Sequence, residues 1–467
     1  MSESGGMVDA VFGGIGFAAR EATLFAACGF LLLGLSDLAV DAIWVARTIW
    51  RRFTIYSRFP RARADTLGGA QAPARLAVFV PAWDEGAVIG DMLRHALATF
   101  DHRDYQIYVG CYPNDPESIA AVTAVRDPRV RLVIGSAPGP TTKADCLNRL
   151  WERLLEDEAR EGVRAKAVVL HDAEDVVHSA ELRIFDQLIE RFDLVQLPVL
   201  PLLDKGSRWI AGHYADEFAE AHGKELVVRE ALGAAVPSAG VGCAFSRDAL
   251  ARIAATGRGG PFDADSLTED YELGLKLRMI GGSAAFVRLP ASLGRPLVVT
   301  HEYFPSTLKA AVSQKARWMV GIALSGWDRL GWQGSFAERW MRLRDRQAVL
   351  ASLLLFAGYV ALLLWGALQL RMILTGVPPQ PVSPELALLL NANLAMLAWR
   401  LAMRFGFVTQ AYGWREGLRS IPRVVVSNII AMLAARRAVF RYLGIRKSGR
   451  TSWDKTTHAF PAELPAE

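Results

Sequence analysis

Acidic side chains recur in this 467-residue chain at points where a short apolar run ends. Carboxylates gathered in one place repel one another unless they share a cation or the hydrogen-bonding edge of a nucleoside. Mg²⁺ and Mn²⁺ are hard cations that take one or two carboxylates together with phosphate oxygens. The acidic groups are Asp84–Glu85, Asn114–Asp115, and Asp172, Glu174 and Asp175. Their order predicts a shared site for a divalent cation and a nucleotide, provided that the fold brings them together.

Each of these residues also has a purely structural interpretation. Lys143 opens a predicted helix, where its ammonium group could reach a phosphate beside the helix N-terminus. A lysine there is, taken alone, more often a solvated surface charge. Asp84 is equally suited to capping a helix. The shared site is favoured because the groups recur in order, each after a predicted strand.

The elements that must position these groups alternate between β-rich apolar runs and helical patterns over residues 74–300. Strand character covers 76–80, 106–109, 130–134 and 167–170, with helical patterns such as 89–99 and 143–155 between them. This alternation predicts an α/β, Rossmann-like domain with a mostly parallel sheet. Ligands of such sheets bind beyond the carboxyl ends of the strands, where the acidic groups stand.

The composition predicts that this domain is attached to a membrane. Hydrophobic residues make up 52% of the chain and charged residues 22%, with a mean hydropathy of +0.19. Residues 348–370 carry no charge and are long enough to cross a hydrocarbon core of about 30 Å. Residues 386–403 and 22–46 are further predicted spans; Asp37 and Asp41 in the last are expected to face protein rather than lipid. The segment 424–440 is predicted to be an amphipathic interfacial helix, with a fourth crossing as the alternative.

The cysteines and the net charge exclude other classes. Four cysteines without a pairing pattern argue against a disulfide scaffold, and no Cys/His spacing suggests zinc. Arginines cluster after the first span and before the second, whereas the loop at 371–385 holds prolines and almost no basic residues. The positive-inside rule places the N-terminus outside and residues 50–345 in the cytoplasm. The net charge of +5 is thereby explained without nucleic acid.

These patterns predict four segments. Residues 1–48 form an N-terminal anchor and 49–330 a cytoplasmic catalytic domain. Residues 331–440 hold the remaining membrane helices and the interfacial helix, and 441–467 form a cytoplasmic tail.

The motifs that follow the predicted strands resemble glycosyltransferase family 2, whose members are inverting, metal-dependent transferases with a GT-A fold. The resemblance covers about residues 74–325. It implies that Val78–Glu85 ends in a nucleotide contact, with Asp84 replacing the usual Asn, and that Asp172–Ala173–Glu174 is the metal motif. The second metal ligand is then Glu174 or the adjacent Asp175, with Mg²⁺ or Mn²⁺ as the cation. The implied donor-binding residues are Pro81, Glu85, Asp115, Lys143 and Arg317.

Two later motifs make this resemblance more specific. Thr268–Glu269–Asp270 resembles the TED motif, whose final Asp is the general base; alone, Asp270 would cap the next helix. Gln314–Trp318 resembles the QxxRW motif of membrane-embedded members. The implied acceptor-side residues are Gln314, Trp318, Gly242 and Cys243, although Cys243 itself is expected to be an apolar filler. Arg317 could alternatively be a membrane-flanking cation, and Trp318 an interfacial tryptophan.

A closer resemblance is to the glycosyltransferase part of the phage adsorption protein B group. Val169–Val176, Pro237–Gly242 and Trp453–His458 carry it. It implies a bacterial inner-membrane enzyme that moves a sugar, hexosyl or N-acetylhexosaminyl, from a UDP-sugar to a saccharide or lipid-linked acceptor, with export proteins as partners. Polysaccharide synthesis is favoured over a single transfer. The alternative class is a non-enzymatic membrane receptor or scaffold built on a transferase fold.

Overall fold

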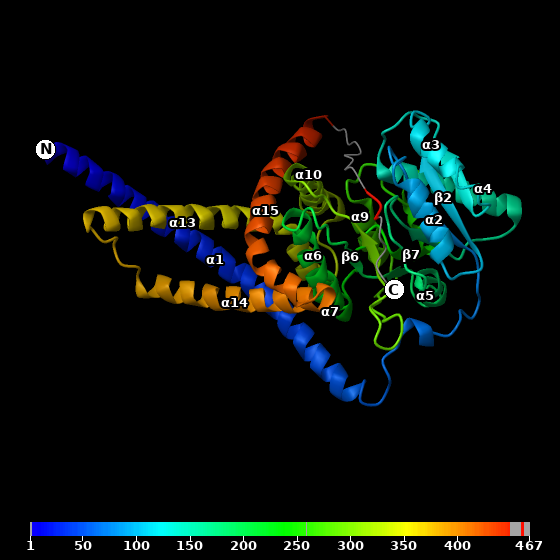
Figure 1. The fold of residues 1–467 in the computed structure, drawn as a ribbon, viewed down its shortest axis with the longest axis horizontal. Helices are drawn as coiled ribbons and strands as arrows, with labels where there is room; N and C mark the ends of the chain where they lie inside the picture. The colour runs from blue at the N-terminus through cyan, green and yellow to red at the C-terminus, as the bar shows by residue number, and fades with distance from the viewer. Residues whose placement is uncertain (1, 258, 449–458, 462–467) are drawn as a thin grey trace.

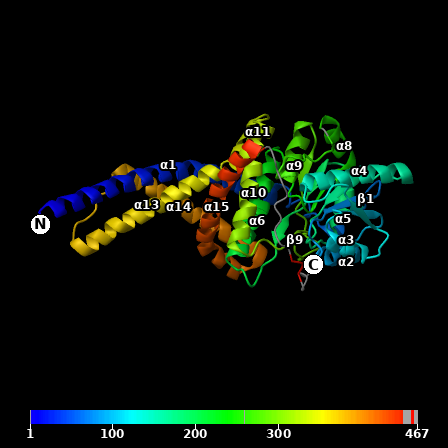
Figure 2. The same cartoon turned by 90° about the horizontal axis from the view of Figure 1, so that it is seen from above.

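The computed structural model describes residues 2–257, 259–448 and 459–461 of the chain. It has a globular α/β part and a bundle of long helices that projects from one side of it (Figure 1). The N-terminus lies at the far end of the bundle, and the view from above shows the same arrangement (Figure 2).

A seven-stranded sheet in the order β3-β2-β1-β4-β7-β5-β8 forms the centre of the globular part. Neighbouring strands run parallel except at β7, which is antiparallel to both β4 and β5. The four strands predicted from the sequence are confirmed, and the order reverses between β1 and β4. The strands are β1 (Leu76–Pro81), β2 (Tyr105–Cys111), β3 (Val130–Ile134), β4 (Ala167–Leu170), β5 (Leu194–Gln196), β7 (Cys243–Ser246) and β8 (Ala284–Phe286).

Helices cover both faces of this sheet because its strands alternate their side chains between two apolar cores. In β1, Leu76, Val78 and Val80 belong to one core, whereas Ala77 and Phe79 belong to the other. The first core is closed by α2 (Ile89–Thr99), α3 (Pro116–Thr123) and α5 (Glu181–Leu188). The second is closed by α4 (Lys143–Glu161), α8 (Arg247–Thr256) and α9 (Glu269–Met279).

A second layer of short elements joins the sheet domain to the long helices. It contains a two-stranded parallel sheet and several short helices. Two of the helical stretches contain a π-helical segment between α-helical ones. Its members are β6 (Val199–Pro201), β9 (Thr300–Glu302), α6 (Ile210–Glu220), η2 (Ala221–Glu225), α7 (Leu226–Ala231), α10 (Leu308–Trp318), η3 (Met319–Ser325), α11 (Gly326–Leu330) and α12 (Phe336–Arg346). A short 3₁₀ turn, η1 (Ala64–Thr66), lies ahead of β1.

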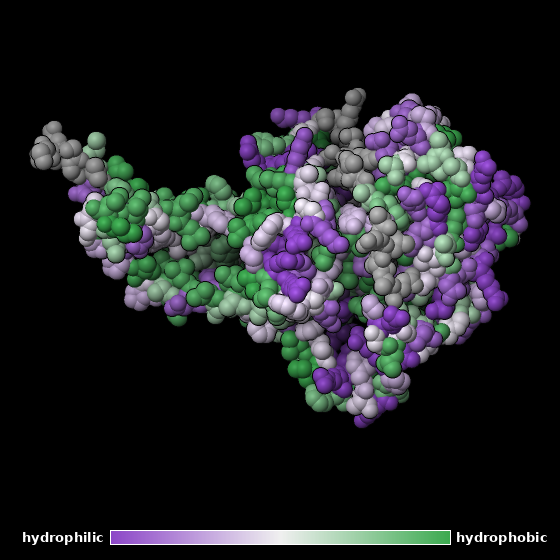
Figure 3. All heavy atoms as spheres, viewed as in Figure 1, coloured by the Kyte–Doolittle hydropathy of each residue, from purple (hydrophilic) through white to green (hydrophobic). Residues whose placement is uncertain are grey.

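Four helices in the described part of the chain are long and apolar enough to cross a membrane, and Figure 3 shows a broad hydrophobic surface along the bundle. The three predicted spans lie within α1, α13 and α14. The helices are α1 (Ser2–Thr54), α13 (Ala348–Thr375), α14 (Pro384–Tyr412) and α15 (Trp414–Ser448). Figure 1 shows α15, which contains the predicted interfacial segment, running across the ends of α13 and α14 rather than alongside them.

Both acidic residues of the first span face protein, as predicted. Asp41 is buried and accepts hydrogen bonds from Lys224 Nζ at 2.5 Å and from Trp399 Nε1 at 2.8 Å. Asp37 pairs with Arg344 at 2.9 Å and Arg400 at 2.5 Å. These pairs join α1 to η2, α12 and α14, so the bundle and the second layer are held together by charges as well as by apolar contacts.

Candidate functional site

The side chain of Asp115, a predicted donor-binding residue, joins the loops that follow β1 and β2. Asp115 is buried; its Oδ2 accepts from the Asp84 backbone N–H at 2.6 Å and its Oδ1 from the Ser118 N–H at 3.2 Å, which caps α3. Asp84 has a φ of 54°, a left-handed conformation that Asp and Asn adopt more readily than other side chains. Its helix-capping interpretation is wrong, because the N-cap of α2 is Val88.

The two neighbouring donor-side predictions lie at the same place. Pro81 is the buried last residue of β1. Glu85 is 6% exposed, and its backbone N–H donates to Ser118 Oγ at 2.8 Å. The structure therefore brings Pro81, Glu85 and Asp115 together at the carboxyl ends of β1 and β2.

An aromatic pair beside these residues escaped the sequence analysis. The rings of Trp83 and Tyr112 meet edge to face with centroids 5.3 Å apart. Gly139 packs against both rings so closely that a Cβ there would overlap them. The Asn114 amide holds that loop from both sides, donating to the Gly139 carbonyl at 2.9 Å and accepting from its N–H at 2.7 Å. Tyr112 is fully buried and supports the partly exposed Trp83, whose flat ring beside polar loops is suited to a base or a sugar.

Lys143 is at the centre of the charged cluster rather than on the surface. It is the first residue of α4, whose N-cap Thr142 accepts a hydrogen bond from the Asp145 N–H. The Lys143 Nζ lies 2.5 Å from Asp172 Oδ1, just beyond the end of β4. Burial alone would lower the pKa of Lys143, but the carboxylates of Asp172, Glu269 and Asp270 raise it well above its usual value.

Glu269 and Asp270 lie in the first turn of α9, whose dipole favours negative charge at this end. Burial and the adjacent Asp270 raise the pKa of Glu269 to about 7, against the opposing effect of Lys143 and Arg317. Burial raises the pKa of Asp270 as well, with Asp172 adding to the shift and Lys143 and Arg317 opposing it. The N-cap residue of this helix is Thr268, but Asp270 Oδ1 accepts from the first-turn N–H of Tyr271 at 2.7 Å, which also opposes the rise in its pKa.

The QxxRW segment meets the TED segment through small residues. Arg317 lies in the last turn of α10, within electrostatic range of Glu269 and Asp270. Gly321, one turn later in η3, packs directly on the side chain of Thr268. The Gln314 Oε1 is buried and has no hydrogen-bond partner among the residues that the structure describes.

Trp318 lies in an aromatic cluster. Its ring is edge-on to Tyr214, with centroids 6.0 Å apart, and also contacts Phe218 and Phe304. The ring remains partly exposed, so its contact with an acceptor sugar stays a prediction.

The glycine-rich segment before β7 lies against the acidic pair, but through a different glycine from the one predicted. Gly240, with φ 79°, faces Asp270 so closely that a Cβ would lie 2.5 Å from its Oδ2. Gly242, with φ 56°, packs instead on Thr300. Cys243 is fully buried, and its Sγ lies 3.1 Å from Ser238 Oγ. The implied contact of Cys243 with the acceptor is therefore wrong: the side chain is fully buried in the core, and burial raises the pKa of its thiol to about 12.

Asp175, the alternative to Glu174 as second metal ligand, has other partners, and its role at the metal stays a prediction. It is fully buried, and its Oδ2 accepts hydrogen bonds from His171 Nδ1 at 2.7 Å and from the Asp172 backbone N–H at 3.1 Å. The His171 Nε2 lies 2.9 Å from Glu181. Burial alone would lower the pKa of His171, but the carboxylates of Glu181 and Asp175 raise it to about 10. The imidazolium is thus held between two carboxylates. Asp175 therefore positions the Asp172 backbone.

The remaining donor groups suit a cation that arrives with phosphate. Among the described residues, no three His, Cys, Asp or Glu side chains are arranged to hold a metal by themselves. Mg²⁺ and Mn²⁺ need only one or two carboxylates when phosphate oxygens complete the shell. The side chain of Asp172 is 29% exposed and pairs with Lys143, and its role as a metal ligand stays a prediction. Glu174 is buried, and its role as the second ligand stays a prediction.

Comparisons with known proteins agree with the resemblance found in the motifs. A family model described as "Glycosyltransferase like family 2" matches residues 73–321. The chain is also 37% identical over 454 residues to "Bacteriophage adsorption protein B" of Escherichia coli (strain K12). That alignment covers 92% of this chain, and the chain spans 60% of the length of the curated relative.

Two solved structures are similar at lower identity. One is a mannosyltransferase from Pyrobaculum calidifontis in complex with GDP-Man and Mn²⁺: identity 16%, TM-score 0.49, covering 92% of this chain and 99% of that one. The other is glucosyl-3-phosphoglycerate synthase from Mycobacterium tuberculosis with Mn²⁺, UDP and phosphoglyceric acid: identity 19%, TM-score 0.34, covering 59% and 86%.

Proposed function

The chain belongs to glycosyltransferase family 2, and from that premise we propose that it is a membrane-bound, inverting glycosyltransferase. The observation that carries the proposal is the cluster of Lys143, Asp172, Glu269, Asp270 and Arg317, drawn from four separate segments and electrostatically coupled. The donor is a nucleoside diphosphate sugar, with UDP-sugars the first to test, and the product is a cell-surface polysaccharide.

Asp270 is the proposed general base. A hydroxyl oxygen of the acceptor attacks the anomeric carbon, its proton passes to the Asp270 carboxylate, and the bond from that carbon to the diphosphate oxygen breaks on the opposite face. The raised pKa of Asp270 suits this role, because a base is most effective when its pKa approaches the working pH. Gly240 leaves space beside the carboxylate that any larger residue would fill.

The two cations of the cluster face the leaving group. Arg317 can donate two hydrogen bonds to the diphosphate, and Lys143 adds a point charge at the N-terminus of α4. A divalent cation bound by Asp172, with Glu174 as the candidate second ligand, would supply further charge neutralisation as a Lewis acid. Asp175, through the Asp172 backbone, keeps that carboxylate in place.

The membrane helices bring the site close to its acceptor. η3 follows the QxxRW segment without a break, and its Val320 shares an apolar cluster with Ala434 and Ala438 of α15. An acceptor attached to a lipid, or a growing chain bound for export, would meet the site beside this helix. We therefore propose a multi-pass location in a bacterial inner membrane, with the globular part cytoplasmic and the N-terminus outside.

The test is sugar transfer by purified membranes given radiolabelled UDP-sugars with Mg²⁺ or Mn²⁺. Asp270→Asn should lower transfer and donor hydrolysis by roughly 10²- to 10⁴-fold, since it removes a positioned base. Asp265→Asn is the matched control, because Asp265 is exposed in the same loop; it should retain wild-type activity. Equal activity of Asp270→Asn and wild type would contradict the base assignment.

A receptor or scaffold is the second candidate, and the name of the curated relative favours it. In that case phage adsorption or docking would survive Asp270→Asn unchanged, and no UDP-sugar or GDP-sugar would be consumed by the wild type. The enzyme proposal requires donor consumption that depends on Asp270. Both properties can be measured on the same pair of membranes.

A further inference from the structure

A large basic cavity lies where the helical bundle meets the globular part, and the proposed transferase mechanism does not use it. Its volume is about 1690 Å³. The walls come from the end of α1, the end of α14, the segment after Asp175 and the loop between β8 and β9. None of Lys143, Asp172, Glu269, Asp270 or Arg317 lines it.

Arginines dominate the polar wall, and their charge is not balanced. Arg47, Arg51, Arg61, Arg288 and Arg295 line the cavity, and within the described residues none of them is in an ion pair. The single lining carboxylate among those residues, Asp91, is already paired with Arg94 at 2.6 Å. Glu230 lies within electrostatic range of Arg47 and Arg51 but does not line the cavity, and its Oε1 accepts from the Phe286 N–H.

Two of these arginines carry buried donors without an acceptor. The Nε atoms of Arg51 and Arg288 are both shielded from solvent and lack a hydrogen-bond partner in the structure. The one hydrogen bond of the Arg288 guanidinium goes from its NH1 group to the Gly223 carbonyl at 3.3 Å. Burial, with Arg61 nearby, lowers the pKa of Arg288 to about 10. Buried charges are normally paired, so these donors point to an anion that completes them.

A second part of the cavity wall is apolar and lies on the membrane helices α1 and α14, with α1 also carrying Arg47 and Arg51. Trp44 of α1 and Phe407 of α14 meet edge to face with centroids 5.0 Å apart, and Ala411 continues this wall. Figure 1 shows these two helices crossing where the bundle reaches the globular part. A ligand that fits both walls has a phosphate at one end and hydrocarbon at the other. Basic pockets beside transmembrane helices are typical sites for anionic lipid headgroups.

We propose that this cavity binds a phosphate-bearing membrane lipid, with Arg51 and Arg288 donating to the phosphate oxygens and the Trp44–Phe407 wall contacting the hydrocarbon. Arginine suits this role because its planar group of N–H donors matches phosphate geometry. Phospholipids and polyprenyl phosphates share this chemistry and are tested side by side.

The experiment is a native mass spectrometry titration of the full-length protein in detergent. The probes are phosphatidylglycerol, a polyprenyl phosphate, zwitterionic phosphatidylcholine and inorganic phosphate. We expect one of the two anionic lipids to bind at least about tenfold more tightly than phosphatidylcholine or inorganic phosphate. Equal binding of phosphatidylcholine would overturn the proposal, and inorganic phosphate binding as tightly as the anionic lipids would show a soluble ligand instead.

The double variant Arg51→Gln/Arg288→Gln should weaken binding of the preferred lipid about tenfold or more. Arg52→Gln/Arg278→Gln removes the same charge from exposed arginines outside the cavity and should stay within about twofold of wild type. Unchanged binding by the first pair would refute the site. Should that pair fail to fold, Arg51→Lys/Arg288→Lys keeps the charge but loses the planar donors; it must bind more weakly than the control pair for the proposal to stand.

Discussion

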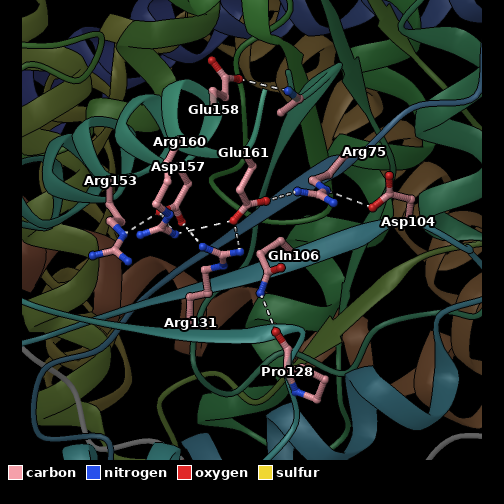
Figure 4. Close-up of polar contacts among 11 residues, drawn as sticks. Arg75, Asp104, Gln106, Pro128, Arg131, Arg153, Asp157, Glu158, Arg160 and Glu161 are labelled. Carbon is pink, nitrogen blue, oxygen red and sulfur yellow. Dashed lines mark hydrogen bonds and ion pairs between the residues drawn. The ribbon is translucent and has the colours of Figure 1, made fainter. Parts of the chain in front are cut away.

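Two charged clusters lie at opposite ends of the strands of the central sheet, and they differ in how their positive and negative charges are balanced. At the edge where the strands begin, Arg75, Arg131, Asp157, Arg160 and Glu161 form a closed network with the end of α4 (Figure 4). At the edge where the strands end, Asp172, Glu269 and Asp270 face Lys143 and Arg317.

The balance of charge distinguishes the two clusters. Hydrogen bonds from Arg131 and Arg75 lower the pKa of Glu161 to about 2, since each carboxylate oxygen in the network has a guanidinium donor. In the site, three carboxylates face two cations, and burial raises the pKa of Glu269 to about 7. A network that only stabilises the fold pairs its charges, whereas a site keeps unmatched charge ready for a ligand or a proton.

The sharpest test of the structural cluster is Asp157→Asn. Asp157 is 3% exposed and accepts from Arg131 at 2.5 Å, Arg153 at 3.0 Å and Arg160 at 2.6 Å. Its loss should lower stability by about 1–3 kcal/mol, because guanidinium groups lose a charged acceptor but can partly turn to water. Thermal unfolding of the detergent-solubilised protein should show a melting temperature several degrees lower, with transfer activity per folded molecule unchanged.

The matched control is Glu156→Gln, one residue earlier on the exposed face of α4. It should leave the melting temperature within about one degree of wild type. A large loss of activity in folded Asp157→Asn would contradict the assignment of this cluster to stability alone.

The acid side of the pH–activity profile tests the catalytic cluster. Transfer should rise with pH on the acid side of the profile, because the Asp270 base must lose its proton, and burial, with Asp172 adding to it, holds the pKa of Asp270 above its usual value against Lys143 and Arg317. Asp270 raises the pKa of Glu269, and this repulsion is mutual, so Glu269→Gln should move the acid side of the profile to lower pH. An unmoved limb in Glu269→Gln would show that the two carboxyls do not titrate together.

The smallest effect is expected at the rim of the structural network. The Arg160 side chain is 58% exposed, so its pair with Asp157 is screened by water. Arg160→Gln should change stability by less than about 0.5 kcal/mol. Thermal unfolding of Arg160→Gln checks this prediction. A loss of stability as large as that of Asp157→Asn would show that the Arg160 pair cannot be removed without disrupting the whole network.

The sequence predicted the strands and most of the charged residues of the site, whereas the contacts between distant segments depended on tertiary packing. The four predicted strands are confirmed because short apolar β-rich runs are typical of strands that are covered on both faces, and alternate side chains of β1 enter two different cores. The alternation of strands and helices also predicted that Lys143 begins a helix after β3 and that acidic residues follow β1, β2 and β4. It did not predict the pairing of Trp83 with Tyr112 or the contact of Gly240 with Asp270, because each joins segments that are distant in sequence or set by loop shape.

Local sequence determined this protein's strands, its long apolar helices and the residue types available for catalysis, because hydrophobic period and charge are properties of neighbouring residues. Only the tertiary structure decided how those residues are used. It turned Asp175 inward to His171, buried Cys243, and placed Asp270 beside Gly240. The exposure and the partners of a side chain depend on elements that are distant in the sequence. A local sequence pattern does not specify which of those elements will cover the side chain.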